Sequence, residues 1–162
     1  MTSQSGFGSL VLGAACRLFA PFMVLFAVYV VVHGHDSPGG GFQGGVILAA
    51  ALILIRLVRG QRIPFGTSRP RLLSVLCAGP IIYIGVGILA VLSGGNFLDY
   101  GALPLGLFIE APSQIRAVGT LVIEVGITLG VAGAVLLIFE ALSSVGPEDD
   151  ASMEDELCFR LR

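Results

Sequence analysis

Charged residues are scarce in this sequence. They make up 12% of the 162 residues, whereas hydrophobic residues make up 55%. A soluble domain carries roughly 25% charged residues, so this chain has too few of them to cover a globular surface. Its hydrophobic residues also gather in long uncharged runs, as they do in chains that span a bilayer. The sequence therefore excludes an ordinary soluble domain and predicts an all-α integral membrane protein.

The sequence also lacks the motifs of enzymes, metal sites and nucleic-acid binding. Its three cysteines are far apart and indicate neither a disulfide framework nor a metal site. There is no Ser/His/Asp constellation, no dinucleotide fingerprint, no lysine for a phosphate-binding loop and no basic surface interleaved with aromatic residues. We therefore expect a protein that is not an enzyme and that has no cofactor, no bound metal and no nucleic-acid partner.

Four apolar runs predict four transmembrane helices. The predicted helices cover residues 6–32, 42–58 (or 44–58), 72–92 and 115–142. At ~1.5 Å per residue, each helix is long enough to cross most or all of the ~30 Å hydrocarbon core, and the second is the shortest. We expect one membrane domain over residues 1–145, followed by a flexible acidic tail over residues 146–162.

Arginines predict the orientation of the chain. Five of them stand in or beside the connector between the second and third predicted helices, with no acid among them: Arg56, Arg59, Arg62, Arg69 and Arg71. The positive-inside rule places this connector, and therefore both termini, in the cytoplasm. Arg17 interrupts the first run, and we expect its long side chain to carry the charge toward the headgroups.

Glycine is concentrated between the first two predicted helices. Residues 33–45 contain six of the 23 glycines, together with a proline. This density predicts irregular backbone, a Gly-rich loop that dips into the membrane against other protein. A packed structural turn is a simpler role for it than anion binding at the following helix start. The predicted loop residues are Gly34, Pro38, Gly39, Gly40, Gly41, Phe42, Gly44 and Gly45.

A single acid, Glu124, lies deep in the fourth predicted helix. A charged group at the centre of a span costs at least ~2.5 kcal/mol, so intramembrane acids commonly mark ion or proton paths. The alternative is a structural carboxyl group bonded to a neighbouring helix. His33, His35 and Asp36 follow the first span and could relay protons to such a path, or the histidines could bond loop backbone instead.

Small residues recur in the fourth predicted helix. Gly126 and Gly130 form a G-x-x-x-G pair, a pattern that lets another helix approach closely. A chain with one buried acid and four spans makes a poor complete transporter, because secondary transporters usually have more spans and internal repeats. We therefore expect these faces to pack in an assembly of membrane subunits.

Two motifs carry a family resemblance. Residues 34–47, G-H-D-S-P-G-G-G-F-Q-G-G-V-I, resemble the G-H-x-x-P-G-G-G-F-x-G-G signature of the MnhB/MrpB family, the B-type subunits of Mrp-type multisubunit sodium/proton antiporters. The segment Glu124-Val125-Gly126-Ile127 is similar to that family's acid followed by Val/Ile-Gly-Val/Ile in the last helix. Motif order and span count also match, so the resemblance extends over nearly the whole chain to about Leu142.

The resemblance implies a small subunit in a bacterial cytoplasmic membrane complex that exchanges Na⁺ for H⁺. The implied partners are other membrane subunits, including large antiporter subunits like those of respiratory complex I, within the lipid bilayer. As the lone deep carboxylate, Glu124 is our predicted protonatable centre of a path, with His35 and Asp36 near its entry. Related modules also occur in energy-converting hydrogenase-like complexes, where the role could be purely structural.

Overall fold

The computed structural model describes residues 7–34, 39–59, 69–105 and 111–144. They form four α-helices and one short 3₁₀-helix: α1 (Phe7–Val32), α2 (Gly40–Arg59), α3 (Arg69–Leu92), η2 (Tyr100–Ala102) and α4 (Pro112–Ser144). All four α-helices are long and apolar enough to cross a membrane. The prediction of an all-α membrane protein with four transmembrane helices is confirmed. The acidic tail lies outside the described residues.

The structure corrects the predicted start of the second helix. Glycines were expected to prevent helix formation up to residue 42 or 44, but α2 begins at Gly40 and is helical throughout. Gly39 keeps a loop conformation, with φ of +96°, and its carbonyl accepts a hydrogen bond of 2.9 Å from the Gln43 amide. Residues 35–38, the rest of the predicted loop, lie outside the described residues.

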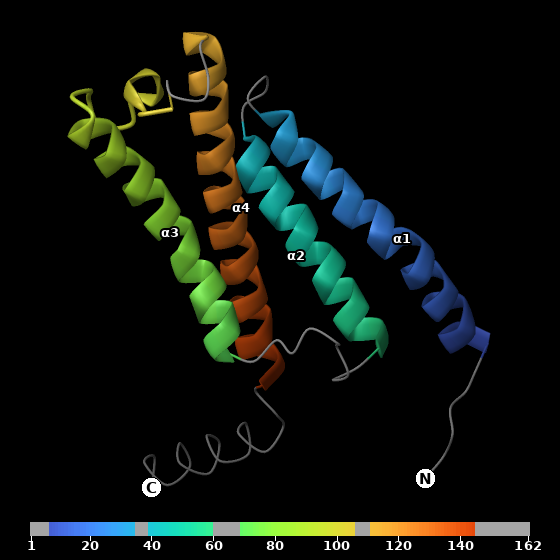
Figure 1. The fold of residues 1–162 in the computed structure, drawn as a ribbon. Coiled ribbons are helices and arrows are strands. Elements are labelled where there is room, and N and C mark those ends of the chain that lie inside the picture. Colours follow the sequence, from blue (N-terminus) through green and yellow to red (C-terminus); the bar gives the residue numbers. More distant parts are fainter. Residues whose placement is uncertain (1–6, 35–38, 60–68, 106–110, 145–162) are drawn as a thin grey trace, which may run out of the picture.

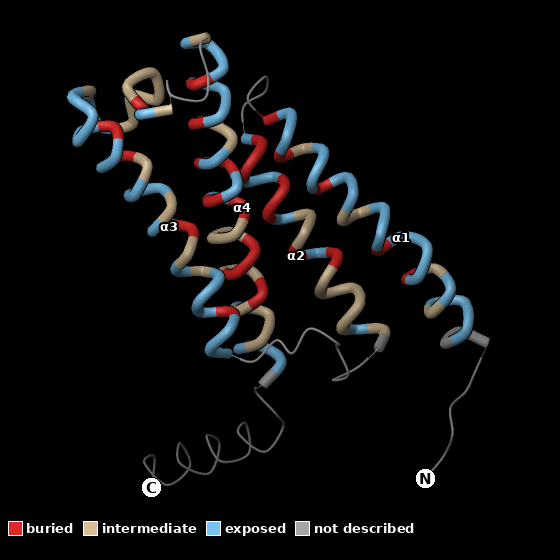
Figure 2. Tube along the Cα trace, in the orientation of Figure 1, coloured by how far each residue is buried: buried red, intermediate tan, exposed pale blue. Residues whose placement is uncertain are grey.

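The helices stand in an open row rather than a closed bundle (Figure 1). Along this row α4 lies between α3 and α2, and α1 covers the far side of α2. Within the described residues, α3 contacts neither α1 nor α2. The chain reverses direction at each connection, so α2 and α4 run parallel to one another. Figure 2 shows the buried positions concentrated where α2 and α4 meet their neighbours, which leaves broad apolar surfaces on α1 and α3.

One stripe of small residues brings α2 against α4. Gly41 and Gly45 stand four residues apart and both face α4. A Cβ atom added to Gly41 would lie 2.7 Å from the backbone oxygen of Glu124, and one added to Gly45 would lie 2.9 Å from that of Thr128. Real Cβ atoms do not approach so closely, so only glycine permits this contact. Ala49, fully buried, continues the stripe toward the other end of α2.

A second stripe brings the neighbouring face of α2 against α1. An added Cβ atom at Gly40 would lie 3.1 Å from the Val30 carbonyl oxygen, and one at Gly44 would lie 3.1 Å from the Ala27 carbonyl oxygen. Positions 40 and 44 lie on one side of the helix, and positions 41 and 45 lie about 100° further round, because an α-helix has ~3.6 residues per turn. The glycine pairs thus let α2 approach two helices at once, which offsets their low helix propensity.

Glycines also bring α3 against α4. A Cβ atom added to Gly79 of α3 would lie 2.7 Å from the Gly126 carbonyl oxygen and 2.8 Å from the Gly130 Cα atom. One added to Gly133 would lie 2.8 Å from the Leu76 backbone nitrogen. The helix that approaches the predicted G-x-x-x-G pair is therefore α3 of the same chain.

The 3₁₀-helix η2 packs against the ends of α3 and α4. Its N-cap is Asp99, whose Oδ1 atom accepts a hydrogen bond of 3.1 Å from the Gly101 amide. Tyr100 lies over Gly119 of α4, where an added Cβ atom would be 2.9 Å from the tyrosine Cβ. Partial burial, and Tyr83 nearby, raise the pKa of Tyr100 above its ordinary value.

The contact between α2 and α4 predicts an asymmetry between two glycine-to-alanine substitutions. Gly45→Ala should destabilise the protein by about 1–3 kcal/mol, because the new methyl group forces the helices apart. Gly85→Ala should be neutral or stabilising by up to about 1 kcal/mol, because it adds helix propensity. Gly85 is helical but has no neighbouring atom within 4 Å of an added Cβ. Thermal unfolding in mild detergent, followed by circular dichroism, measures both, and equal melting temperatures would contradict the packing role.

Candidate functional site

Glu124 is buried on α4 where the end of α1 meets the start of α2. It is 8% exposed. A Cβ atom added to Gly34, just after α1, would lie 2.6 Å from the carboxyl carbon of Glu124. The carboxyl group therefore occupies space that exists only because residue 34 has no side chain. Gly41, at the start of α2, touches the backbone of the same glutamate. The glycine-rich motif and the acid of the second motif thus form one site.

Glu124 lies near the middle of α3 but at the ends of α1 and α2. It follows Pro112 by twelve residues, which places it about 18 Å along α4 at 1.5 Å per residue. Nearby Gly126 packs against Ile82, in the middle of α3. Relative to α1 and α2, however, Glu124 lies at their ends, and α4 continues well past those ends (Figure 1). The carboxyl group is therefore enclosed by protein yet close to the junction of α1 and α2.

Thr128 ties this site together one turn further along α4. Its hydroxyl oxygen lies 2.7 Å from the Glu124 carbonyl oxygen and 3.0 Å from the Gly41 carbonyl oxygen. A hydroxyl group has one proton, so it donates to these two acceptors in turn or shares the proton between them. Thr128 is 8% exposed. Sequence reasoning missed this residue, although a polar side chain four residues after a buried acid lies on the same helix face.

His33 directly follows α1, and its contacts are with Tyr29 of that helix. Its Nδ1 atom lies 3.1 Å from the Tyr29 carbonyl oxygen, within hydrogen-bond distance, and its ring stacks on the Tyr29 ring at 4.2 Å between centroids. The side chain is exposed. This geometry matches the backbone-bonding alternative considered for the histidines. His35 and Asp36 lie outside the described residues, so their part in a proton relay stays a prediction.

A second charged centre joins the opposite end of α2 to α4. Arg56 forms an ion pair with Glu140, and the two side chains are only 12% and 21% exposed. The Arg56 guanidinium also lies over the Phe139 ring, 5.5 Å from its centroid. Both charged residues belong to helices that can span the membrane. Sequence reasoning assigned Arg56 to the cytoplasmic connector and did not single out Glu140.

The two charged centres stand at opposite ends of the contact between α2 and α4. Glu124 and Glu140 are sixteen residues apart, or about 24 Å along the helix axis. Between them the contact consists of small and apolar side chains, among them Ala49, Ala132 and Leu136. In the part of the chain that the structure describes, no group of three or more His, Cys, Asp or Glu side chains could hold a metal ion.

These features define a multi-pass membrane protein with a buried carboxyl group at a glycine-lined helix junction. Residues 11–137 match the family model described as a domain related to the MnhB subunit of Na⁺/H⁺ antiporter. The chain belongs to this family, and the family predicted from its two motifs is confirmed.

Several known proteins are similar to this chain in sequence. A Bacillus subtilis (strain 168) protein, named as the B-type subunit of a Na(+)/H(+) antiporter, is 30% identical over 125 residues, which cover 74% of this chain and 87% of that protein. A Staphylococcus haemolyticus protein named putative antiporter subunit mnhB2 is 29% identical over 82% of this chain and 93% of its own length. An uncharacterized Methanocaldococcus jannaschii protein is 32% identical over 60% of this chain, but the match covers only 37% of that longer protein.

The partly buried ion pair predicts coupling between Arg56 and Glu140. Arg56→Met or Glu140→Met alone should destabilise the protein by about 1–3 kcal/mol, because each leaves the other charge without its partner. The double variant should recover to within about 1 kcal/mol of the parent, since two apolar side chains of similar volume replace the pair. A double-mutant cycle of thermal unfolding measures the coupling, and additive effects of the two substitutions would refute it.

Proposed function

We propose that this chain is a small membrane subunit of a multisubunit cation/proton antiporter, in which Glu124 forms part of the ion path. The observation that carries the proposal is the carboxyl group buried between α4 and the junction of α1 and α2. The names of the Bacillus and Staphylococcus relatives support the same assignment. The exchanged ions would be Na⁺ and H⁺.

The chemistry of the site suits alternating occupancy by a proton and a cation. A carboxyl group carries either a proton or a negative charge that attracts a cation, so the two ligands compete for one group. Hard cations prefer carboxylate, carbonyl and hydroxyl oxygens. Oxygens of these kinds occur along this part of α4: the Glu124 carboxyl group lies against Gly34, and one turn further along the Thr128 hydroxyl lies 3.0 Å from the Gly41 carbonyl oxygen. Competition of this kind couples the movement of one ion to that of the other.

The open row of helices supports a role inside a larger assembly. Large apolar side chains on α1 and α3 are exposed, for example Leu25 at 66% and Ile81 at 68%. Lipid can cover such surfaces. An ion path through Glu124, however, must be lined by protein or water, and this chain alone does not enclose such a path on all sides. We infer that other membrane subunits, including large ones like the antiporter subunits of complex I, complete the path. The complex would lie in the bacterial cytoplasmic membrane.

The proposed orientation follows from arginines that lie at the same ends of the helices, on one side of the membrane. Arg56 near the end of α2 and Arg69 and Arg71 at the start of α3 lie at the end where α4 also finishes. The positive-inside rule makes this end cytoplasmic, together with both termini. Glu124 then lies toward the outer side of the membrane.

A purely structural role is the alternative, in an antiporter or in an energy-converting hydrogenase-like complex. The close glycine contacts and the Arg56–Glu140 pair favour it, because both fix the relative positions of helices without any need to move ions. In that case Glu124 would be a fixed carboxyl group that never changes its proton during turnover.

Substitution of Glu124 separates these roles. We expect Glu124→Gln to abolish cation-driven proton movement in membrane vesicles, because an amide of the same shape neither ionises nor exchanges a proton. Assembly, judged on native gels, should be unchanged. Asp99→Asn is the matched control: it removes an acid outside the four spans, and an amide oxygen can still accept the Gly101 hydrogen bond. Full transport by the Glu124→Gln complex would establish the structural role instead.

Displacement of the carboxyl group tests its position. Gly34→Ala keeps Glu124 but places a methyl group where its carboxyl group now lies. Because the far end of a flexible side chain can move, we expect normal assembly with at least a severalfold rise in the apparent KM for the cation. Gly85→Ala, at a position with open space around it, should leave the KM unchanged. The KM is read from proton uptake at graded Na⁺ concentrations, and an unchanged value for Gly34→Ala would argue against ion binding at this carboxyl group.

A further inference from the structure

Arg17 is a charged residue on the outside of a membrane-spanning helix. It lies seven residues inside the candidate span Leu10–Val32, about 10 Å from its start at 1.5 Å per residue. Its side chain is exposed, and among the described residues it has neither a hydrogen bond nor an ion pair. Arg56 has Glu140, whereas Arg17 meets no acid of this chain's described part. A guanidinium at this depth is costly without a counter-charge, and the described part of the chain provides none.

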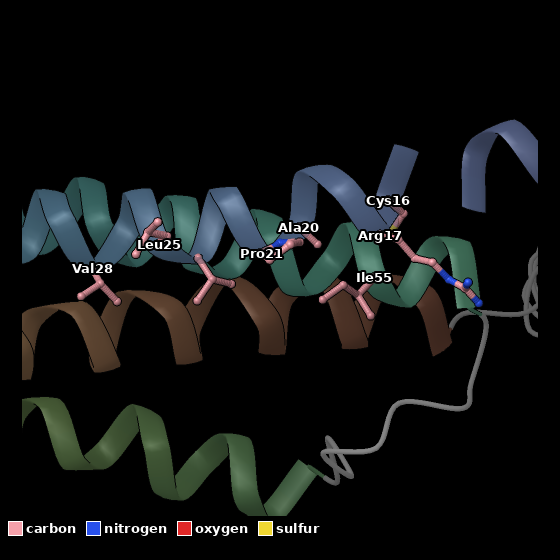
Figure 3. A pocket seen from close by; sticks show the side chains of 8 residues that line it. Cys16, Arg17, Ala20, Pro21, Leu25, Val28 and Ile55 are labelled. Carbon is pink, nitrogen blue, oxygen red and sulfur yellow. The ribbon is translucent and has the colours of Figure 1, made fainter. Parts of the chain in front are cut away.

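An apolar groove begins at Arg17 and runs along α1 (Figure 3). It has a volume of about 550 Å³. From Arg17 the groove passes Ala20, Pro21 and Leu25 and ends near Val28, and Ile55 of α2 borders it. Figure 3 shows the Arg17 side chain reaching away from this groove toward the end of α2. Long helical side chains point toward the helix N-terminus, so the charge moves toward the membrane surface that we assign to the cytoplasm.

The length of the groove matches one leaflet of a bilayer. Arg17 and Val28 are eleven residues apart, about 16 Å along α1 at 1.5 Å per residue. The hydrocarbon core is ~30 Å thick, so one acyl chain extends over about half of it. A groove that begins at a positive charge near the interface and ends near mid-membrane has the dimensions of a single phospholipid chain.

The polar end of the groove has room for a headgroup. A second hollow, of about 630 Å³, continues from Arg17 along α1 to Leu10. Gly13 lines this hollow, and no atom lies within 4 Å of a Cβ atom added there. The backbone is also more polar beside Arg17. Pro21 has no N–H group to donate to the Arg17 carbonyl oxygen four residues earlier, so this carbonyl lacks its usual helical hydrogen bond.

We propose that this groove binds an anionic phospholipid, with its phosphate on Arg17 and one acyl chain along Ala20, Leu25 and Val28. The guanidinium group recognises phosphate oxygens through two parallel hydrogen bonds. An anionic lipid neutralises the Arg17 charge, whereas a zwitterionic headgroup brings a positive charge of its own. A transmembrane helix of a partner is a poorer occupant, because it would need an acid at one fixed position. The inference is independent of the function proposed for Glu124.

Lipid retention by the intact assembly tests the site. The full chain, with the subunits that co-purify with it, is transferred to nanodiscs of equal phosphatidylglycerol and phosphatidylcholine, and retained lipids are counted by native mass spectrometry. We expect Arg17→Gln to lower the retained phosphatidylglycerol about fivefold, the contribution of one arginine near an anionic surface. Arg17→Lys should retain it, and phosphatidylcholine should not change. Arg116→Gln removes an exposed arginine near the start of α4, on the opposite side of the membrane from Arg17, and should have no effect.

Cross-linking identifies the occupant of the groove itself. Phosphatidylglycerol with a photoactivatable group at the end of one acyl chain should label α1 near Val28, and Arg17→Gln should remove that label. Equal phosphatidylglycerol retention by Arg17→Gln and the parent would overturn the proposal. A cysteine introduced at Val28 that cross-links to another subunit in good yield would also overturn it, because the groove would then hold protein.

Discussion

The close approach of α2 to its neighbours is the constraint on which the rest of this structure depends. Inside a bilayer, helices gain little hydrophobic energy by associating, so van der Waals contact between closely approaching backbones holds them together. Gly41 and Gly45 allow that contact with α4, and Gly40 and Gly44 allow it with α1. Without these glycines α2 would stand further from both helices, and the polar groups of α4 would lose their enclosure.

The same glycines decide what surrounds the buried acid. Glu124 fills the space that Gly34 leaves at the end of α1, and Thr128 reaches the Gly41 carbonyl across the contact. A carboxyl group in hydrocarbon is costly unless protein or water surrounds it. The G-G-G-F-Q-G-G motif therefore does two things at once: it positions a helix, and it builds one wall of a polar site.

Helix α4 organises the charges of this chain. It contacts α2, α3 and η2, and it provides both Glu124 and Glu140. At one end of α2 the acid is held at a helix junction, and at the other end Arg56 holds Glu140. Arg17 stands apart from both, on the outer face of α1. Helix α4 thus directs Glu124 and Glu140 toward its neighbours within the chain, whereas Arg17 is exposed on α1.

The sequence by itself determined the class of this protein, its four spans, its family and the presence of a buried acid at Glu124. These conclusions follow from composition, the length of uncharged runs and local motifs, all of which are properties of neighbouring residues. The sequence misled us at Gly40–Gly45, since helix propensity disfavours glycine and only contact with two other helices makes these residues helical. Tertiary structure alone paired Arg56 with Glu140, residues 84 positions apart, and set Gly34 against Glu124. Such pairings depend on which helix faces meet, and that is decided by packing over the whole row rather than by any local pattern.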